Sequence, residues 1–206
     1  MDPYRLPSSI IPSRYDIRLS PDLDATAFEG QETIALDVRE PIEEVVLNAA
    51  ELEIVTAELE DADGERWPCA ARLDETTERL HLSPPRPLTP GTWHLSLSFR
   101  GTLNDRLRGF YRVNYQEPDG QSAVLAATQF ESTDARRAFP CWDEPSFKAV
   151  FSLTLTIDPQ LTAVANTSIL SEAVENGLKV IRFADTIRMS TYLVAIVVGR
   201  LAIPPA

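Results

Sequence analysis

Apolar and polar residues alternate with a period of two along much of this chain, and this alternation most constrains its fold. Residues 93–99, WHLSLSF, show it most clearly, directly after the turn signal of Pro90 and Gly91. Because successive side chains of a strand point to opposite faces of a sheet, the pattern predicts a strand that is buried on one face only. The same alternation recurs in four further segments, residues 15–19, 34–38, 52–54 and 151–157.

Turn signals separate these segments at the short intervals typical of all-β proteins. The chain has 16 prolines, and glycines follow Asp or Asn at Gly64, Gly120 and Gly177. Continuous apolar runs predict further strands that are covered on both faces, at residues 45–47, 124–126 and 193–198. About a dozen strands with short connections predict an all-β fold, either one large twisted sheet or two packed sheets, mostly antiparallel.

One short segment, residues 133–139, is expected to be helical. Ser132 or Thr133 is placed to cap its N-terminus, and Pro140 to end it. No internal repeat, low-complexity tract or change of composition divides the chain. We therefore expect residues 1–206 to form a single domain.

Charge and hydropathy exclude several classes of protein. The 31 acidic and 19 basic side chains give a formal net charge of −12, which argues against binding nucleic acid through a basic surface. The longest apolar run, residues 193–198, is much shorter than a membrane-spanning helix, which needs about 20 residues, so no membrane span is expected. Without an export signal at its start, we expect a cytoplasmic protein whose cysteines, Cys69 and Cys141, are reduced thiols.

Histidines, which often bind catalytic metals, are scarce. The chain has two, His81 and His94, on different predicted strands. Each lies between two apolar residues, so its side chain is expected on the polar face, solvated or capping rather than bound to a metal. The chain also lacks the HExxH, GxSxG and glycine-rich phosphate-loop motifs. The residues alone therefore assemble no complete active site.

Charged and aromatic side chains are concentrated in residues 124–147, which predicts a partly buried polar network. Within this segment Gln129 and Glu131 are two positions apart and, on a strand, would project from the same face. A carboxylate there could receive an ammonium group, a charge-assisted contact worth about 1.5–3 kcal/mol. The residue chemistry also leaves open that Glu131 is a structural or solvated side chain.

Residues 128–145, TQFESTDARRAFPCWDEP, resemble the signature segment of the zinc aminopeptidases of the aminopeptidase N type. Three other segments agree with this resemblance. Residues 12–16 (PSRYD) resemble the first strand of the family, residues 109–112 (GFYR) an upstream motif, and residues 189–199 (MSTYLVAIVVG) the last strand before the catalytic domain. The likeness extends over nearly the whole chain, in the order of the family.

This resemblance implies the N-terminal domain of such an enzyme, a saddle-shaped all-β unit that packs against a thermolysin-like zinc domain. It implies that Glu131 binds the free α-amino group of a peptide substrate and that Gln129 lines the pocket for the first side chain. Zinc, its ligands and the catalytic residues belong to the next domain of the family. The resemblance therefore implies that this chain alone binds no zinc and is inactive.

Two details of the signature refine this expectation. Ser132 stands where relatives often carry proline, which is a departure that should leave Glu131 in place. Members similar to leukotriene A4 hydrolase carry glutamine at the position of Glu131, so the glutamate favours a plain aminopeptidase. The remaining charged residues are expected to be structural and to pair with one another: Asp134, Arg136, Arg137, Asp143 and Glu144.

Two alternatives stay open. The first is a non-catalytic protein-binding β module with the same fold, because the family includes a transcription-complex subunit without the zinc chemistry. The second is a free-standing β domain that binds proteins through the face that a catalytic domain would cover. An exposed apolar patch on that face would make the isolated chain self-associate.

Overall fold

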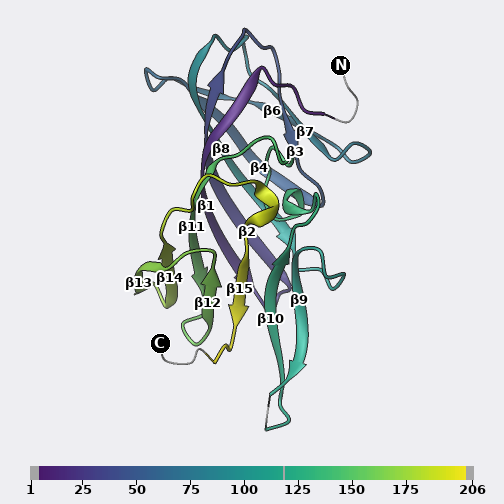
Figure 1. Cartoon of the computed structure of the whole chain (residues 1–206), viewed down its shortest axis with the longest axis vertical. Helices are drawn as coiled ribbons and strands as arrows, with labels where there is room; N and C mark the ends of the chain where they lie inside the picture. Colours follow the sequence, from purple (N-terminus) through teal and green to yellow (C-terminus); the bar gives the residue numbers. More distant parts are fainter. Residues whose placement is uncertain (1–4, 118, 203–206) are drawn as a thin grey trace.

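A computed structural model describes residues 5–117 and 119–202 and shows an all-β fold, which confirms the predicted class (Figure 1). Its largest sheet has eight strands in the order β13-β14-β11-β1-β2-β8-β4-β5. These strands are β13 (Ile169–Glu175), β14 (Leu178–Phe183), β11 (Val150–Ile157), β1 (Ile10–Asp22), β2 (Ala27–Val38), β8 (Gly91–Thr102), β4 (Leu52–Glu60) and β5 (Arg66–Pro68). Neighbours are antiparallel except β1 and β11, which are parallel.

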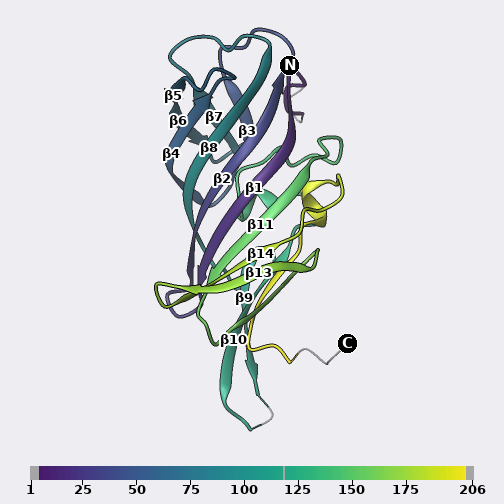
Figure 2. The ribbon, with the colours of Figure 1, turned by 90° about the vertical axis from the view of Figure 1, so that its left-hand side faces the viewer.

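Two smaller antiparallel sheets complete the fold. One has four strands in the order β12-β15-β10-β9, which are β12 (Thr162–Ala165), β15 (Ile196–Gly199), β10 (Ser122–Gln129) and β9 (Gly109–Gln116). The other has three, in the order β3-β7-β6, which are β3 (Val45–Asn48), β7 (Arg79–Ser83) and β6 (Ala70–Asp74). The three-stranded sheet lies toward one end of the molecule, and the β9–β10 hairpin extends at the other (Figure 1). The large sheet twists strongly from β8 to β13 (Figure 2).

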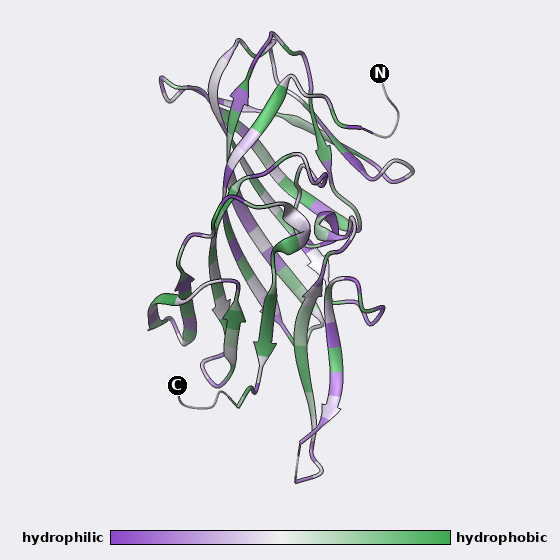
Figure 3. Ribbon diagram, viewed as in Figure 1, coloured by the Kyte–Doolittle hydropathy of each residue, from purple (hydrophilic) through white to green (hydrophobic). Residues whose placement is uncertain are grey.

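The period-two pattern determines which face of each strand is buried. On β11 every second residue from Phe151 to Ile157 is buried, and the strands of the large sheet show alternating apolar and polar bands (Figure 3). The buried faces share one hydrophobic cluster, in which Tyr15 stacks on Phe151 and both rings meet the edge of Phe139. Phe139 comes from the signature segment, so this segment is packed into the core.

The continuous apolar runs were predicted with mixed success. All four residues of β3 are buried, as predicted for residues 45–47. The prediction for residues 193–198 is wrong at its start, because Leu193 is 46% exposed and ends a 3-10 helix, η2 (Thr191–Leu193). The strand begins at Ile196, and alternating burial within the run shows that β15 is covered mainly on one face.

The predicted helical segment at 133–139 is present as a single 3-10 helix, η1 (Ala135–Arg137). Its N-cap is Asp134 rather than Ser132 or Thr133, and no side chain caps it. The reason is that the Asp134 N–H donates to the Phe130 carbonyl at 2.9 Å. This bond makes residues 131–134 a turn, so the helix starts only at Ala135 and both residues lie before its N-cap position.

Two glycines of the large sheet lie directly beneath aromatic rings of neighbouring strands. Gly30 of β2 is opposite Phe99 of β8, and Phe28 is opposite Gly101. A Cβ atom at Gly30 would come within 2.2 Å of the Phe99 ring, so the ring packs on bare backbone. We expect Gly30→Ala to lower the free energy of unfolding by about 1–3 kcal/mol, the usual cost of overpacking. Urea unfolding of the purified chain measures it.

The same substitution in a Phe99→Leu variant tests whether the Phe99 ring causes the expected loss of stability. In Phe99→Leu the ring is absent, so Gly30→Ala should cost clearly less than it does in the parent chain. An equal cost in both backgrounds would show that the close approach of Phe99 is not what excludes a side chain at position 30.

Candidate functional site

The end of β10 carries the two residues that the sequence singled out. β10 pairs with β9 along its full length, and its last residue, Gln129, is opposite Gly109. On the other side Ala126 and Ala127 pair with β15, and the Ile196 N–H donates to the Thr128 hydroxyl at 2.8 Å. The strand end is therefore held from both sides.

Glu131 lies beyond this strand end, in a turn. The two residues do not share a strand, because β10 ends at Gln129 and Glu131 starts the turn 131–134, so the condition for their projecting from one strand face is not met. Phe130 between them is 2% exposed and meets the edge of Phe139 at 5.8 Å between ring centroids. Phe130 thus anchors the backbone in the core, while Gln129 and Glu131 on either side of it are exposed.

Within the described part of the chain, no hydrogen bond or ion pair engages the Glu131 carboxylate or the Gln129 side-chain amide. This holds although two arginines follow within six positions. Both arginines are bound to other carboxylates, so neither neutralises Glu131.

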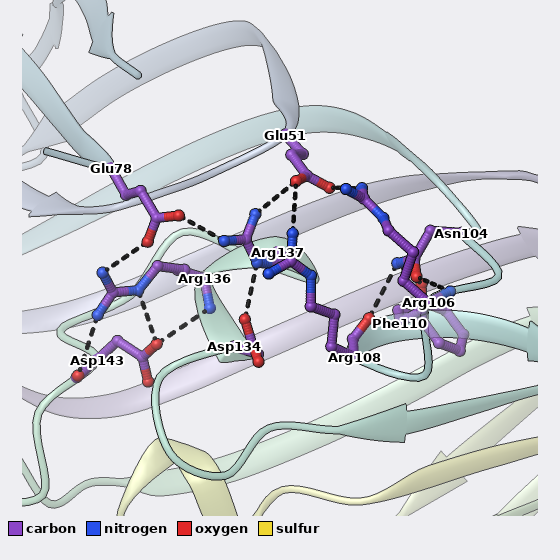
Figure 4. Close-up of polar contacts among 10 residues, drawn as sticks. All are labelled: Glu51, Glu78, Asn104, Arg106, Arg108, Phe110, Asp134, Arg136, Arg137 and Asp143. Carbon is purple, nitrogen blue, oxygen red and sulfur yellow. Dashed lines mark hydrogen bonds and ion pairs between the residues drawn. The ribbon is translucent and has the colours of Figure 1, made fainter. Parts of the chain in front are cut away.

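Arg136 and Arg137 form the centre of a cluster of ion pairs (Figure 4). Arg137 Nε donates to Asp134 Oδ1 at 2.8 Å, its Nη1 donates to Glu51 Oε1 at 2.7 Å, and its Nη2 donates to Glu78. Arg136 Nη1 donates to the other oxygen of Glu78 at 3.1 Å. The arginine side chains are 12% and 9% exposed, so these contacts are largely shielded from water.

Charges balance within this cluster, which we call the arginine cluster. It contains four arginines and four carboxylates: Arg106, Arg108, Arg136, Arg137, Glu51, Glu78, Asp134 and Asp143. Burial opposes the charged form of Arg137, but its hydrogen bond to Asp134 and the charges of Glu78 and Glu51 outweigh burial. The pKa of Arg137 is therefore raised above its ordinary value.

Glu51 and Glu78 reach the cluster from turns with unusual backbone. Their φ angles are 57° and 53°, in the left-handed region that L-residues seldom adopt. Glu51 connects β3 to β4, and Glu78 lies between β6 and β7. Neither turn is near the signature segment in sequence, and no spacing or motif indicated them. The three-stranded sheet thus supplies acids that hold the turn after β10.

Asp143 forms the most buried arm of the cluster, with a side chain 1% exposed. It accepts hydrogen bonds from Arg136 Nε at 3.0 Å and from the Thr191 hydroxyl at 2.7 Å, and its N–H donates to Asn48 Oδ1 at 3.2 Å.

Burial, with the charge of Asp143, raises the pKa of the neighbouring Cys141 thiol well above its usual value. Cys141 is therefore a buried neutral thiol, as expected, and both cysteines are unpaired.

Glu144 pairs outside the cluster. It contacts Arg5 at 3.5 Å and accepts the Leu6 N–H, so it ties the start of the described chain to the signature segment. The prediction that the charged signature residues pair structurally is thus in agreement with the contacts of Asp134, Arg136, Arg137, Asp143 and Glu144.

Both histidines lie away from this site. His94 is exposed on β8, and His81 on β7 bonds through Nδ1 to Glu44 at 2.9 Å. In residues 5–117 and 119–202, no group of three or more His, Cys, Asp or Glu side chains could hold a metal ion. No helix in these same residues is long and apolar enough to cross a membrane.

Comparisons with known proteins point to one family. The profile of the Peptidase M1 N-terminal domain matches residues 11–193. Aminopeptidase M1-D of Oryza sativa subsp. japonica is 46% identical over 195 residues, which are 95% of this chain and 22% of that protein. The puromycin-sensitive aminopeptidase of Caenorhabditis elegans is 38% identical over 200 residues, 96% of this chain and 21% of that protein.

A bacterial relative is also an aminopeptidase. Aminopeptidase N of Acetobacter pasteurianus is 38% identical over 196 residues, 95% of this chain and 54% of that sequence. The chain spans about a fifth of the length of the plant and nematode relatives, 22% and 21%. It therefore corresponds to one part of proteins that are several times longer.

Proposed function

The chain belongs to the peptidase M1 N-terminal domain family, and from this membership we propose that it is the substrate-anchoring domain of a zinc aminopeptidase. Such an enzyme removes N-terminal amino acids from peptides. The aminopeptidase names of its relatives support this activity for the whole protein. In this proposal residues 1–206 act as one domain, which the single hydrophobic cluster shared by the three sheets supports.

The proposal rests on the exposure of the Glu131 carboxylate and on its lack of a charged partner among the described residues. Its carboxylate is exposed on a turn whose backbone is anchored by Phe130, and it has no cation within the described chain although four arginines belong to the adjacent cluster. An unneutralised carboxylate on an anchored backbone suits the α-ammonium group of a peptide, because charge-assisted hydrogen bonds to a carboxylate are strong. Glu131 is the proposed recognition residue.

Recognition of the terminus also explains how such an enzyme would select the first peptide bond. An internal amide carries no positive charge, so only a free N-terminus gains the contact with Glu131. A carboxylate at a constant distance from the reacting centre then places the first peptide bond, and no other, where cleavage occurs. Gln129, exposed at the end of β10, is proposed to line the pocket for the first side chain.

The residues of this chain do not fit a zinc site, because its described part groups no three potential metal ligands. We propose that zinc and the catalytic groups belong to a further domain of the whole enzyme, which packs against this one. The chain then contributes binding and orientation, and by itself would be inactive. Its partners would be that domain and peptide N-termini.

Steady-state kinetics of the whole enzyme test the role of Glu131. We expect Glu131→Ala and Glu131→Gln to raise KM for aminoacyl substrates by about 10- to 100-fold, the loss of one charge-assisted contact. Glu53→Gln, which removes an exposed glutamate from β4, is the matched control and should leave KM unchanged. An unaltered KM in both Glu131 variants would reject the proposed role.

The rival, a protein-binding module without zinc chemistry, makes a different prediction. The parent reading frame beyond the codon for Ala206 should encode HExxH if the enzyme proposal is correct. Its absence there would favour the binding module.

A further inference from the structure

The position of Glu131 depends on a turn that the arginine cluster holds closed. The turn leaves β10 at Gln129, passes through Glu131 and ends at Asp134, whose N–H donates to the Phe130 carbonyl at 2.9 Å. On the strand side the backbone is secured by β-ladder bonds to Gly109. On the other side the turn is attached through Asp134, which pairs with Arg137, and through the next residues, where Ala135 is buried and the Arg136 carbonyl accepts from the Ala50 N–H at 2.9 Å.

Asp134 is in turn held by Arg137. Its carboxylate accepts from Arg137 Nε at 2.8 Å, and the same guanidinium is bound by Glu51 and Glu78 from two other turns. A guanidinium that spends its Nε and both terminal nitrogens on three carboxylates has one orientation, unlike an exposed arginine with many rotamers. The position of Asp134 is therefore set by the three-stranded sheet.

Gly109 brings Arg137 close to the strand that carries Gln129. A Cβ atom at Gly109, where φ is +67°, would lie 2.7 Å from Arg137 Cβ. Arg137 thus packs directly on the backbone of the β9 residue that pairs with Gln129. The turn is confined between β9, the core residue Phe130 and the arginine cluster.

We infer that Asp134 and Arg137 are positioning residues for substrate: through the Asp134 backbone they fix the turn on which the Glu131 carboxylate meets the peptide ammonium. This inference rests on the proposed function. The cluster then serves binding as well as folding.

The first test uses the chain itself and hydrogen exchange. Arg137→Lys keeps the charge but has one nitrogen in place of the three separate guanidinium nitrogens that bind Asp134, Glu51 and Glu78. We expect the Asp134 amide to exchange about tenfold faster in this variant, because the bond that closes the turn opens more often. Amides in β1 and β2 should be unchanged and report that the fold is intact. Unchanged exchange at Asp134 would overturn the inference.

The second test uses the whole enzyme and couples two positions. Asp134→Ala should raise KM about tenfold with little change in kcat, since misplacement of a binding group weakens binding. In a Glu131→Ala background the same change should have almost no further effect, because the group that it positions is gone. Asp185→Asn, in an Asp–Arg pair that shares no residue with the cluster, is the matched control and should leave KM unchanged.

The outcomes separate the two proposals. If Glu131→Ala raises KM and Asp134→Ala does not, the positioning role is overturned while the proposed function stands. Equal effects of Asp134→Ala with and without Glu131 would also overturn it, because they indicate a general structural change. If Glu131→Ala itself leaves KM unchanged, the proposed function fails and the positioning role fails with it.

Discussion

Replacement of Asp143 by alanine is expected to destabilise the domain by about 3–5 kcal/mol, the usual cost of removing one partner from a buried ion pair. Its side chain is 1% exposed and accepts hydrogen bonds from Arg136 and Thr191. Without it, the 12% exposed Arg136 keeps Glu78 and a 3.5 Å hydrogen bond to the main-chain carbonyl of residue 143, and the Thr191 hydroxyl loses its acceptor. Urea unfolding of the purified chain measures the loss.

Two comparisons identify the cause. Asp143→Asn keeps the size and an acceptor oxygen, so it should lose less stability than alanine while still removing the charge. Asp185→Ala removes a carboxylate from the Arg14 pair, whose side chains are 36% and 50% exposed, and should cost no more than about 1 kcal/mol. If Asp143→Ala costs no more than Asp185→Ala, the cluster does not stabilise the domain through its buried arm.

The strands were predictable because their information is local. Alternation within a few residues identified β1, β2, β8 and β11, and burial along each strand follows that alternation. The polar network of the signature segment was also predictable, since its arginines and carboxylates lie close together in sequence, between Asp134 and Glu144. These features depend on period and composition, which a single sequence displays directly.

The acids that complete the cluster were not predictable, because their contacts are distant in sequence. Glu51 and Glu78 are separated from Arg137 by 86 and 59 positions. Each is an ordinary glutamate in an acidic chain until the three-stranded sheet folds against the turn after β10. The turn itself was also missed: Glu131 follows the alternation of β10, so the pattern indicates a strand where Asp134 closes a turn instead.

Unlike Glu51 and Glu78, Glu32 has a position that the sequence pattern does indicate, although burial is unusual for a glutamate. It has the same parity as Ile34, Leu36 and Val38, which puts it on the buried face of β2. It is 3% exposed and lies between Ile17 of β1 and Leu97 of β8, which are both buried. Within the described residues, neither carboxyl oxygen has a hydrogen-bond partner. A buried carboxyl group without partners strongly disfavours ionisation.

The contribution of Glu32 to stability should therefore fall as the pH rises. Burial raises the pKa of Glu32 well above its usual range, so the folded state keeps a proton that the unfolded state releases. The contribution of Glu32 to stability is fully present below the unfolded pKa of a glutamate, about 4.3. Above it, this contribution declines by about 1.4 kcal/mol per pH unit until the pH reaches the raised pKa of Glu32 in the folded state.

Glu32→Gln should remove this decline, since glutamine cannot ionise. At pH 7 the variant should be more stable than the parent chain, and near pH 4 the two should agree. Glu32→Met should be stabilising at both values, by about a further 1–3 kcal/mol, because it also removes the unpartnered polar atoms. Urea unfolding between pH 4 and 8 measures both effects and stays below the range in which Tyr15 and Cys141, which sense the charge of Glu32, would ionise.

The matched control lies on the same strand. Glu29 of β2 points to the opposite face, where its side chain is 70% exposed and contacts Arg100 at 3.0 Å. Glu29→Gln should leave the pH dependence of unfolding unchanged, because solvent already stabilises that charge. If Glu32→Gln and Glu29→Gln show the same pH dependence as the parent chain, Glu32 is ionised in the folded protein and must have a partner that neutralises it.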